Sequence, residues 1–376
     1  MSGHAGLLPL GPPRFAFERL MTRRLLAFVQ TSGIAPPLAR LGVFTADQAL
    51  QALGAALGFT LGDPTRARMV RVLLDFLADC GYLDSAPGGS FAWRGPARVS
   101  ALAAGDASAP AASGGADRGD GCASCRQVDF FEQCLAYAPQ YLRGGPPLFD
   151  FDAGSADAWE QLLGNDDFAF ARALLARTVL PRDERPCHAL VLCYGPGYDL
   201  VEIERRRPHA MVTAIDFTDS FRARASGRLR HPERVRWVGS ATWGGFGAPL
   251  PFPSDTFDVV LFSCADPYVP ADLCDAVYGD IRRTVRPEGV LGVLTRSYPD
   301  LERRDVQDEW VRRGTFCHDF LESVCKGWQG FRSAAGSRRL FQDVGFTIDV
   351  VTLGGSVWRL VKGGAGTSPP PEARGV

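Results

Sequence analysis

Short apolar runs alternate with amphipathic segments through the second half of the chain. The runs have the length of buried strands, and the segments between them carry apolar residues at helical spacing among charged ones. The strand-like runs are residues 189–193, 211–215 and 235–239, a run that ends at Cys264, and residues 290–295. The end of the chain, 345–362, has the pattern of two strands joined by a glycine-rich turn. This alternation predicts a parallel sheet covered by helices and completed by an antiparallel hairpin.

The first hundred residues have a different pattern, in which helices come first and a hairpin comes last. An amphipathic helix is expected from Phe15 to Val29, and a second helix begins near Thr45. A third helix follows Asp63, with Pro64 in its first turn. Two short apolar runs around a Pro-Gly-Gly turn then predict a β-hairpin. Three helices closed by a hairpin are the pattern of a winged-helix domain.

Composition marks the boundaries between these parts. Residues 103–121 consist mainly of Ala, Gly, Ser and Asp, which predicts a flexible linker. Residues 122–184 have a mostly helical pattern and are rich in aromatic residues, which form a core or line an apolar pocket. The expected parts are a winged-helix domain at 1–102, the linker at 103–121, a helical connector at 122–184, a second domain at 185–362 and a disordered tail at 363–376.

Charge argues against a nucleic-acid partner. The 376-residue chain has a formal net charge of −1, whereas a protein that binds a polyanion usually presents a positive surface. Winged helices often bind DNA, but here the third helix mixes Arg66 and Arg68 with Asp75 and Asp79. A DNA-binding helix needs a clearer basic stripe. We therefore expect the first domain to form a homodimer or to close a pocket, and DNA binding is the rival interpretation.

The sequence lacks the features of a membrane, secreted or metal-binding protein. No run of about 18 apolar residues is present, so no membrane span is expected, and the N-terminus lacks the pattern of a secretory signal. The ten cysteines have no framework spacing, which favours reduced thiols in a cytoplasmic protein. Cys122 and Cys125 form one isolated CxxC pair. Although Cys187-His188 and Cys317-His318 offer further ligands in principle, no metal site is expected.

One strand–turn–helix–strand unit carries the candidate chemistry. The run that begins at Ala189 ends in a turn with Gly195 and Gly197, a helical segment follows, and the next strand ends at Asp216. Glycines let the backbone approach a ligand closely, and the start of a helix offers unpaired N–H groups. An acid about 20 residues after the glycine turn accepts the hydroxyls of a ribose. The unit therefore predicts a nucleoside site, although a tight turn in any α/β protein has the same pattern.

Taken together, these pieces resemble the class I S-adenosylmethionine-dependent methyltransferases over about residues 185–362. Beyond the glycine turn, the resemblance rests on Leu250-Pro-Phe-Pro-Ser-Asp-Thr-Phe-Asp-Val-Val before the fourth strand, on Arg286-Pro-Glu-Gly before the fifth, and on the closing hairpin. A nicotinamide-binding unit would have a third glycine where this chain has Leu200. The first domain narrows the resemblance to small-molecule O-methyltransferases that dimerise through a winged helix.

The resemblance implies a fold, a cofactor and a class of acceptor. The fold is α/β, with a Rossmann-like seven-stranded methyltransferase sheet that ends in an antiparallel hairpin and follows a mainly helical winged-helix domain. The cofactor is S-adenosylmethionine, and the acceptor is a small molecule such as a phenolic or polyketide-like secondary metabolite. The residues expected to bind the cofactor follow the ends of the first four strands: Tyr194, Gly195, Gly197, Asp216, Phe217, Ser240, Ala241, Ser263 and Cys264.

Four positions depart from the family's pattern. Cys193 replaces the acid that usually lies two residues before the first glycine, and Asp199 stands where a glycine is common. Ala241 stands where the family often has an acid near the adenine, and Ala265 replaces the His that acts as general base in plant-type members. The acid expected to bind the ribose, Asp216, is kept.

These departures leave the catalytic base and the reaction open. Asp266 is preferred as a base by its position after the fourth strand, and His318 by its chemistry, since an unperturbed His titrates near neutrality. Either residue can instead have a structural role. One hypothesis is a small-molecule methyltransferase. The other is a methyltransferase-fold protein that binds S-adenosylmethionine or another ligand without methylating, either as a non-methylating enzyme or as a ligand-sensing regulator.

Overall fold

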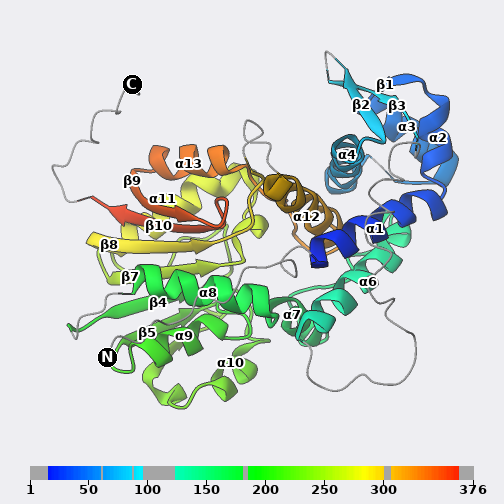
Figure 1. The fold of residues 1–376 in the computed structure, drawn as a ribbon. Coiled ribbons are helices and arrows are strands. Elements are labelled where there is room, and N and C mark those ends of the chain that lie inside the picture. Colours follow the sequence, from blue (N-terminus) through cyan, green and yellow to red (C-terminus); the bar gives the residue numbers. More distant parts are fainter. Residues whose placement is uncertain are drawn as a thin grey trace, which may run out of the picture. The chain divides into compact units, whose positions relative to one another are not determined.

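The computed structural model describes residues 16–60, 62–86, 89–95, 123–180, 185–299 and 306–363. The chain forms two compact units (Figure 1). Unit 1 comprises Met1–Cys122, Val128–Leu148 and Leu301–Cys325, and unit 2 comprises Ala123–Gln127, Phe149–Asp300 and Lys326–Val376.

Unit 1 is mainly helical and contains a small antiparallel sheet of order β1-β3-β2. Its elements are α1 (Ala16–Thr31), α2 (Ala35–Arg40), β1 (Val43–Thr45), α3 (Ala46–Leu57), α4 (Pro64–Asp79), β2 (Leu83–Ala86), β3 (Ser90–Trp93), most of α6 (Ala123–Leu142) and α12 (Val306–Glu322). The three expected helices and the hairpin are present, whereas the short α2 and β1 were not expected. Assignment of this unit to the winged-helix class stays a prediction.

Local capping explains where the helices of unit 1 begin. The Thr45 side chain accepts a hydrogen bond from the Gln48 N–H, and the Gln48 side chain accepts one from the Thr45 N–H, so the start of α3 is a complete capping box. Asp63 accepts bonds from two backbone N–H groups at the start of α4, where Pro64 occupies the first turn. Both expected helix starts are therefore confirmed.

Helix α12 belongs to unit 1, although it lies within the sequence range 185–362 expected for the second domain. It packs against α1 and α4. Arg312 and Arg313 both pair with Asp79 at the end of α4, and Asp319 pairs with Arg68 at 2.7 Å. Apolar packing and buried ion pairs thus join residues that lie more than 230 positions apart.

Unit 2 is built on a seven-stranded sheet of order β6-β5-β4-β7-β8-β10-β9. The strands β6 (Val235–Val238), β5 (Met211–Ile215), β4 (His188–Leu192), β7 (Phe257–Ser263) and β8 (Val285–Leu294) are parallel. The strand β10 (Val357–Lys362) runs antiparallel between β8 and β9 (Phe346–Thr352). The expected parallel sheet and closing hairpin are confirmed.

Helices cover both faces of this sheet. Helices α11 (Cys274–Thr284) and α13 (Ala334–Asp343) pack on the face that presents Leu192, Phe262 and Val293. The other face carries α8 (Asp166–Val179) and α9 (Tyr198–Arg206), and α10 (Arg222–Arg228) packs against α9. Helix α7 (Ala156–Leu163) also belongs to this unit. The parallel strands thus lie between two helical layers and end at one common edge (Figure 1).

Two segments of unit 2 differ from expectation. The expected helix at 219–230 is limited to α10, and the loop expected at Arg286-Pro-Glu-Gly289 forms the exposed start of β8. The β7–β8 register shifts between Phe257 and Val259, which lets β8 begin beside β7 before its buried part starts.

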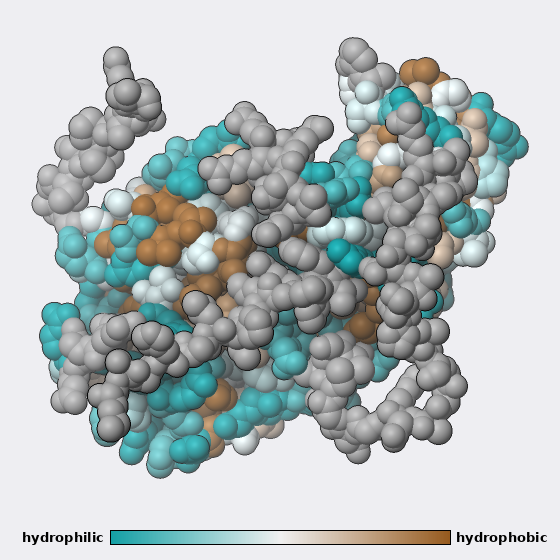
Figure 2. All heavy atoms as spheres, viewed as in Figure 1, coloured by the Kyte–Doolittle hydropathy of each residue, from teal (hydrophilic) through white to brown (hydrophobic). Residues whose placement is uncertain are grey.

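The visible surface of the described residues is mostly polar. Figure 2 shows polar side chains over most of the face in view and hydrophobic ones gathered over the β9 and β10 end of the sheet. None of the helices in the described part of the chain is long and apolar enough to cross a membrane.

Candidate functional site

The turn after β4 has the tight backbone that its glycines predict. Gly195 and Gly197 have φ angles of 47° and 89°, and Cys193 also has a positive φ of 56°. A Cβ atom at Gly197 would lie 2.7 Å from the Cα and Cβ of Ala225 on α10, whereas a Cβ at Gly195 would meet nothing within 4 Å. Gly197 therefore lets α9 and α10 approach each other, and Gly195 leaves open space above the turn.

Asp216, the residue after β5, lies directly beside this turn. Its side chain is only 2% exposed. The Gly195 N–H donates to Oδ2 at 3.0 Å, and the Thr218 N–H donates to Oδ1 at 3.2 Å. Burial raises the pKa of this carboxyl to about 7, although the backbone N–H groups oppose the shift. Each oxygen keeps a lone pair for a further donor, as recognition of a ribose requires.

Aromatic rings continue from Asp216 across the carboxyl edge of the sheet. The half-buried Phe217 ring lies 5.1 Å from Phe151, which stacks on Trp159 and also lies 5.0 Å from Tyr268. Tyr268 in turn contacts Trp328 at 5.1 Å. The Thr218 hydroxyl donates to the Phe151 carbonyl at 2.9 Å, which fixes the first part of this row to the loop after β5.

The loop after β6 contains Ser240 and Ala241, which were expected at the adenine end of the cofactor. Ser240 donates through its hydroxyl to Asp219 at 2.7 Å. Ala241 is exposed. A Cβ atom at Gly239 would lie 2.3 Å from a carboxylate oxygen of Asp219. An acid in the loop after β5 thus lies close to the position where the sequence lacks one.

The exit of β7 presents Ser263 and Cys264. Ser263 is 9% exposed, and its hydroxyl has no hydrogen-bond partner among the described residues. Cys264 has a positive φ of 62°, and its N–H donates to the Leu294 carbonyl at 2.7 Å. The hydroxyl of the buried Tyr194 likewise lacks a partner in the described part of the chain. Buried polar atoms without partners are rare, and a bound molecule is one explanation for them.

Asp266, expected as a catalytic base, lies in a buried hydrogen-bond network. It is 2% exposed and begins a short 3-10 helix, Asp266–Tyr268. Tyr278 and Arg332 both donate to its Oδ1, and the Thr295 hydroxyl donates to Oδ2 at 3.2 Å. Arg332 also reaches the Cys274 sulfur at 3.3 Å. This network links the β7 exit to α11, to the end of β8 and to the segment before α13.

His318, the other expected base, is a buried residue of unit 1. It is 4% exposed, and its Nδ1 lies 3.2 Å from a carboxylate oxygen of Glu322, one turn later on α12. Its ring lies 4.5 Å from Phe131 and 5.7 Å from Phe17, measured between ring centroids. The residues of its own unit thus surround the imidazole.

The cysteine pairs that offered a metal site are divided between the two units and the part of the chain outside the described residues. Cys122 and the side chain of Cys125 lie outside the described residues. Cys187 and Cys317 are both buried. Among the described side chains, no group of three or more His, Cys, Asp or Glu residues has the arrangement of a metal site.

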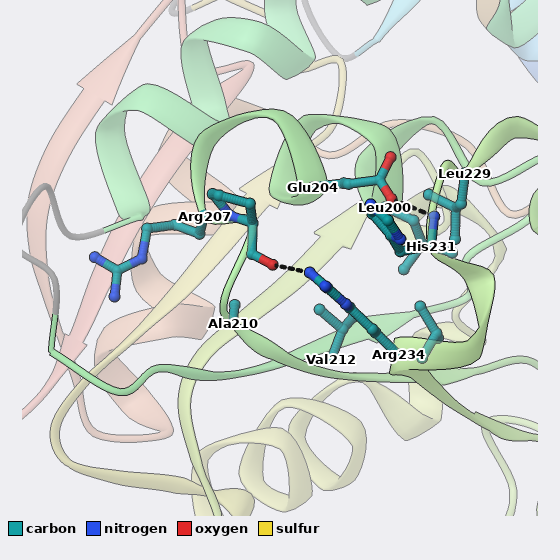
Figure 3. A pocket seen from close by; sticks show the side chains of 10 residues that line it. Leu200, Glu204, Arg207, Ala210, Val212, Leu229, His231 and Arg234 are labelled. Atoms are coloured by element: carbon teal, nitrogen blue, oxygen red, sulfur yellow. Dashed lines mark hydrogen bonds between the residues drawn. The ribbon is translucent and has the colours of Figure 1, made fainter.

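A small surface pocket lies at the opposite edge of the sheet. Figure 3 shows it between the end of α9 and the beginning of β5 and β6, with Leu200, Glu204, Val212 and Arg234 among the residues that line it. Glu204 accepts from the N–H groups of Arg230 and His231, and Arg234 donates to the Pro208 carbonyl. These polar groups already bond to the protein and hold the end of α9 to the segments before β5 and β6. The pocket lies away from the glycine turn.

Sequence reasoning assigned no role to one buried acid near the turn. Asp199, in the first turn of α9, is 7% exposed, and Arg172 on α8 is 4% exposed. Burial raises the pKa of Asp199, and the positive charge of Arg172 and the nearby Ser263 hydroxyl oppose that shift. The only signal in the sequence is the acid in place of a glycine, because the residues that bury it come from α8 and β7.

The residues at the carboxyl edge fit a nucleoside with an amino-acid extension. Asp216 offers acceptors for ribose hydroxyls, and the open space above Gly195 leaves the backbone accessible. Phe217 offers an apolar ring beside Asp216. The buried hydroxyls of Tyr194 and Ser263 offer unused hydrogen-bonding groups on either side of the turn. The predicted cofactor residues that follow β4, β5 and β7 therefore lie at the same edge of three adjacent strands.

Comparisons with known proteins agree with this geometry. Residues 189–289 match the family model of the methyltransferase domain. No curated protein sequence matches the chain. The CurJ carbon methyltransferase has a TM-score of 0.62 at 15% identity, over 93% of this chain and 91% of that one. The DszA carbon methyltransferase has a TM-score of 0.58 at 17% identity, over 93% and 90%.

A third structure is similar in fold. The O-methyltransferase family 2 protein from Planctomyces limnophilus, in complex with apigenin, has a TM-score of 0.56 at 14% identity, over 96% of this chain and 98% of that one. At such identities these likenesses show the fold, while the match at 189–289 covers the glycine turn, Asp216 and β7. Residues 189–289 therefore match a methyltransferase domain, and the chain has the fold of these methyltransferases.

Proposed function

We propose that the chain transfers a methyl group from S-adenosylmethionine to a hydroxyl of a small aromatic or polyketide-like molecule. The observation that carries the donor half of this proposal is the buried Asp216 carboxylate beside the glycine turn, with lone pairs left for ribose hydroxyls. The acceptor half is supported by the row of rings from Phe217 through Phe151 and Tyr268 to Trp328. A flat apolar acceptor packs well against such rings.

The role of the protein in this reaction is mainly to position the two reactants. S-adenosylmethionine supplies the methyl group, which the acceptor oxygen attacks as the carbon–sulfur bond breaks. Asp216 holds the ribose, and Phe217 packs beside it. Correct positioning of a nucleophile supplies roughly 7–11 kcal/mol of a barrier. An acidic phenol depends less on a protein base, because it gives up its proton to water more readily than an alcohol does.

We infer that neither expected base takes the proton of the acceptor. Asp266 already accepts from Tyr278, Thr295 and Arg332. We therefore assign it a positioning role, in which it fixes the loop after β7 and hence Tyr268. His318 is enclosed by Phe17, Phe131 and Glu322 of its own unit, and we assign it a packing role. A general base typically contributes 10²–10⁴-fold, so its absence restricts the acceptor to acidic hydroxyls.

The test measures binding and turnover separately in the full-length chain. Calorimetry with S-adenosylhomocysteine measures binding, and methyl-labelled S-adenosylmethionine with a panel of phenols measures transfer by mass spectrometry. We expect labelled phenol ether from wild type and a large loss of both signals in Asp216→Ala, since a charge-assisted hydrogen bond contributes about 1.5–3 kcal/mol. Label found on carbon would correct the acceptor atom, and normal cofactor affinity in Asp216→Ala would contradict the assigned site.

The engagement of both bases also favours a second function. A chain that binds S-adenosylmethionine without methylating needs the cofactor residues but no free base, and here Asp266 and His318 are both bonded within the protein. It would act as a non-methylating enzyme or as a ligand-sensing regulator. This function is supported if calorimetry shows binding while no labelled product forms with any phenol.

We also propose that the chain acts in the cytoplasm as a homodimer joined through residues 15–100. The rival role, DNA binding, is disfavoured by the weak basic character of α4, where Arg66 pairs with Asp63 and Arg71 with Asp47. Light scattering of the purified chain at micromolar concentration should give twice the monomer mass. A monomer would contradict the dimer, and tight, salt-sensitive DNA binding would support the regulator.

A further inference from the structure

The amino-acid end of the cofactor requires a counterion that the usual position does not supply. Cys193 stands two residues before the first glycine, and burial raises the pKa of its thiol well above the ordinary value. A neutral thiol is a weak hydrogen-bond partner and forms no ion pair with an ammonium group. The ammonium of S-adenosylmethionine therefore lacks an acidic partner at this position.

Asp199 is a buried acid at the start of the helix that follows the glycine turn. It lies in the first turn of α9, directly after the glycine turn, and is 7% exposed. Asp216 is the other buried acid of this strand–turn–helix–strand unit, and it faces Gly195 and Thr218. A carboxylate at this depth loses much of its hydration, so a nearby cation stabilises it strongly.

The protein compensates the charge of Asp199 only in part. Arg172 is the cation that faces it, and Glu202 on the same helix adds a repulsive charge. No arginine or lysine of the described chain comes within ion-pair distance of Asp199. The guanidinium of Arg172 instead donates to the Leu163 carbonyl and lies over the Tyr198 ring at 4.6 Å. The carboxylate therefore keeps the capacity to bind a second cation.

Ser263 gives an independent indication of a ligand at the same place. Its hydroxyl lies near enough to Asp199 to lower the pKa of that carboxyl, yet it completes no hydrogen bond among the described residues. Ser263 ends β7, the strand that pairs with β4, so it lies at the carboxyl edge beside the turn. A buried hydroxyl and a buried carboxylate side by side form a site for an ammonium group, which donates three hydrogen bonds.

We propose that Asp199 and Ser263 bind the ammonium of the cofactor's amino-acid end, in place of the acid that Cys193 replaces. This inference rests on the proposed use of S-adenosylmethionine, and it names the residues by which the protein would distinguish that cofactor from a nucleoside without an amino acid. Two groups of residues then bind two parts of the ligand. Asp216 recognises the ribose, whereas Asp199 and Ser263 recognise the amino acid.

Two ligands separate these contacts without any turnover. S-adenosylhomocysteine carries the amino-acid end, while 5′-methylthioadenosine has the same nucleoside and lacks it. Calorimetry with the full-length chain should show that Asp199→Asn lowers affinity for S-adenosylhomocysteine by roughly ten- to hundredfold, the range for a charge-assisted contact. Its affinity for 5′-methylthioadenosine should be unchanged. Asp216→Asn should weaken both ligands, because both contain the ribose.

Two further variants keep the test informative. Ser263→Ala removes one hydroxyl and should weaken S-adenosylhomocysteine alone by a few fold, even if Asp199→Asn does not fold. Glu204→Gln is the matched control, because Glu204 lies on the same helix and accepts from the N–H groups of Arg230 and His231, away from the glycine turn. It should leave both affinities unchanged.

The results that overturn the proposal are distinct from those that overturn the function. Equal loss of both ligands in Asp199→Asn would make Asp199 a support of the glycine turn, and no loss of either would remove it from the site. Absence of binding by the wild-type chain would instead overturn the proposed function together with this inference.

Discussion

The substitution Asp216→Asn should change stability and cofactor affinity in opposite directions. The carboxyl is 2% exposed, and burial raises its pKa to about 7 in the folded chain, against about 3.9 in an unfolded one. The folded state therefore holds a proton that the unfolded state has released at intermediate pH. A neutral amide has no such proton to lose, so the variant should escape the resulting destabilisation.

The sign and size of the effect follow from linkage. Below about pH 4 both states are protonated and Asp216 has no effect; as pH rises toward 7 only the unfolded state ionises, so stability falls. About 3 pKa units at 1.36 kcal/mol each give a destabilisation of at most about 4 kcal/mol above pH 7. At pH 5 only about 1.5 kcal/mol of it has developed. The free energy of unfolding of Asp216→Asn should therefore gain about 2.5 kcal/mol on wild type between pH 5 and pH 8.

Urea unfolding of both proteins at a series of pH values tests this. The amide also disturbs the bonds from Gly195 and Thr218, but that loss does not depend on pH and cancels in the comparison. The buried Asp199 is present in both proteins and cancels as well. Calorimetry on wild type should show affinity for S-adenosylhomocysteine rising about tenfold from pH 6 to pH 8, as the carboxylate that accepts ribose hydroxyls forms. Parallel stability curves for the two proteins from pH 5 to pH 8 would refute the reasoning.

Three further outcomes follow from contacts described above. Gly197→Ala should lower stability by about 1–3 kcal/mol and weaken cofactor binding, because Gly197 has a left-handed φ and its added Cβ would meet α10. Gly195→Ala should lower stability by only about 1 kcal/mol, because its added Cβ would meet nothing. Thermal unfolding measures stability and calorimetry measures binding, and equal effects of the two substitutions would contradict this reasoning. Arg332→Leu leaves the buried Asp266 charge without its cation and should lower the free energy of unfolding by about 3 kcal/mol, whereas an unchanged urea midpoint would show that the ion pair contributes nothing. Thr45→Ala removes one half of a capping box and should lower stability by about 1 kcal/mol with no change in affinity for S-adenosylhomocysteine, so altered affinity would contradict a purely local role.

Local signals were sufficient for most elements of the fold. The capping residues Thr45 and Asp63 fixed two helix starts, and the period of apolar residues located every strand of the large sheet. The short elements escaped prediction for a physical reason. β1 has three residues and depends on pairing with β3, and α2 has six residues, two of them prolines. Neither is long enough to show a period.

The candidate site was predictable where it is local and unpredictable where distant residues meet. The glycine turn and Asp216 lie about 20 residues apart on consecutive elements, so their spacing predicted their contact. The partners of Asp266 come from α11, β8 and the segment before α13, and no sequence pattern links them. The same holds for Asp199, whose environment depends on Arg172 and Ser263. A sequence shows which acidic residues are present, but it does not show which of them are buried away from solvent in the folded chain.

The composition of unit 1 from separated segments has a consequence for synthesis of the chain. Helices α1 and α4 emerge from the ribosome early, yet the helix that packs against both, α12, ends at Glu322. Asp79 therefore has no access to Arg312 and Arg313 until more than 230 further residues have been synthesised. During that interval the nascent chain exposes an apolar surface that its own later part will cover, and chaperones recognise such surfaces. A fragment ending near residue 102 would keep this surface permanently exposed, so the isolated first domain should aggregate where the full chain folds.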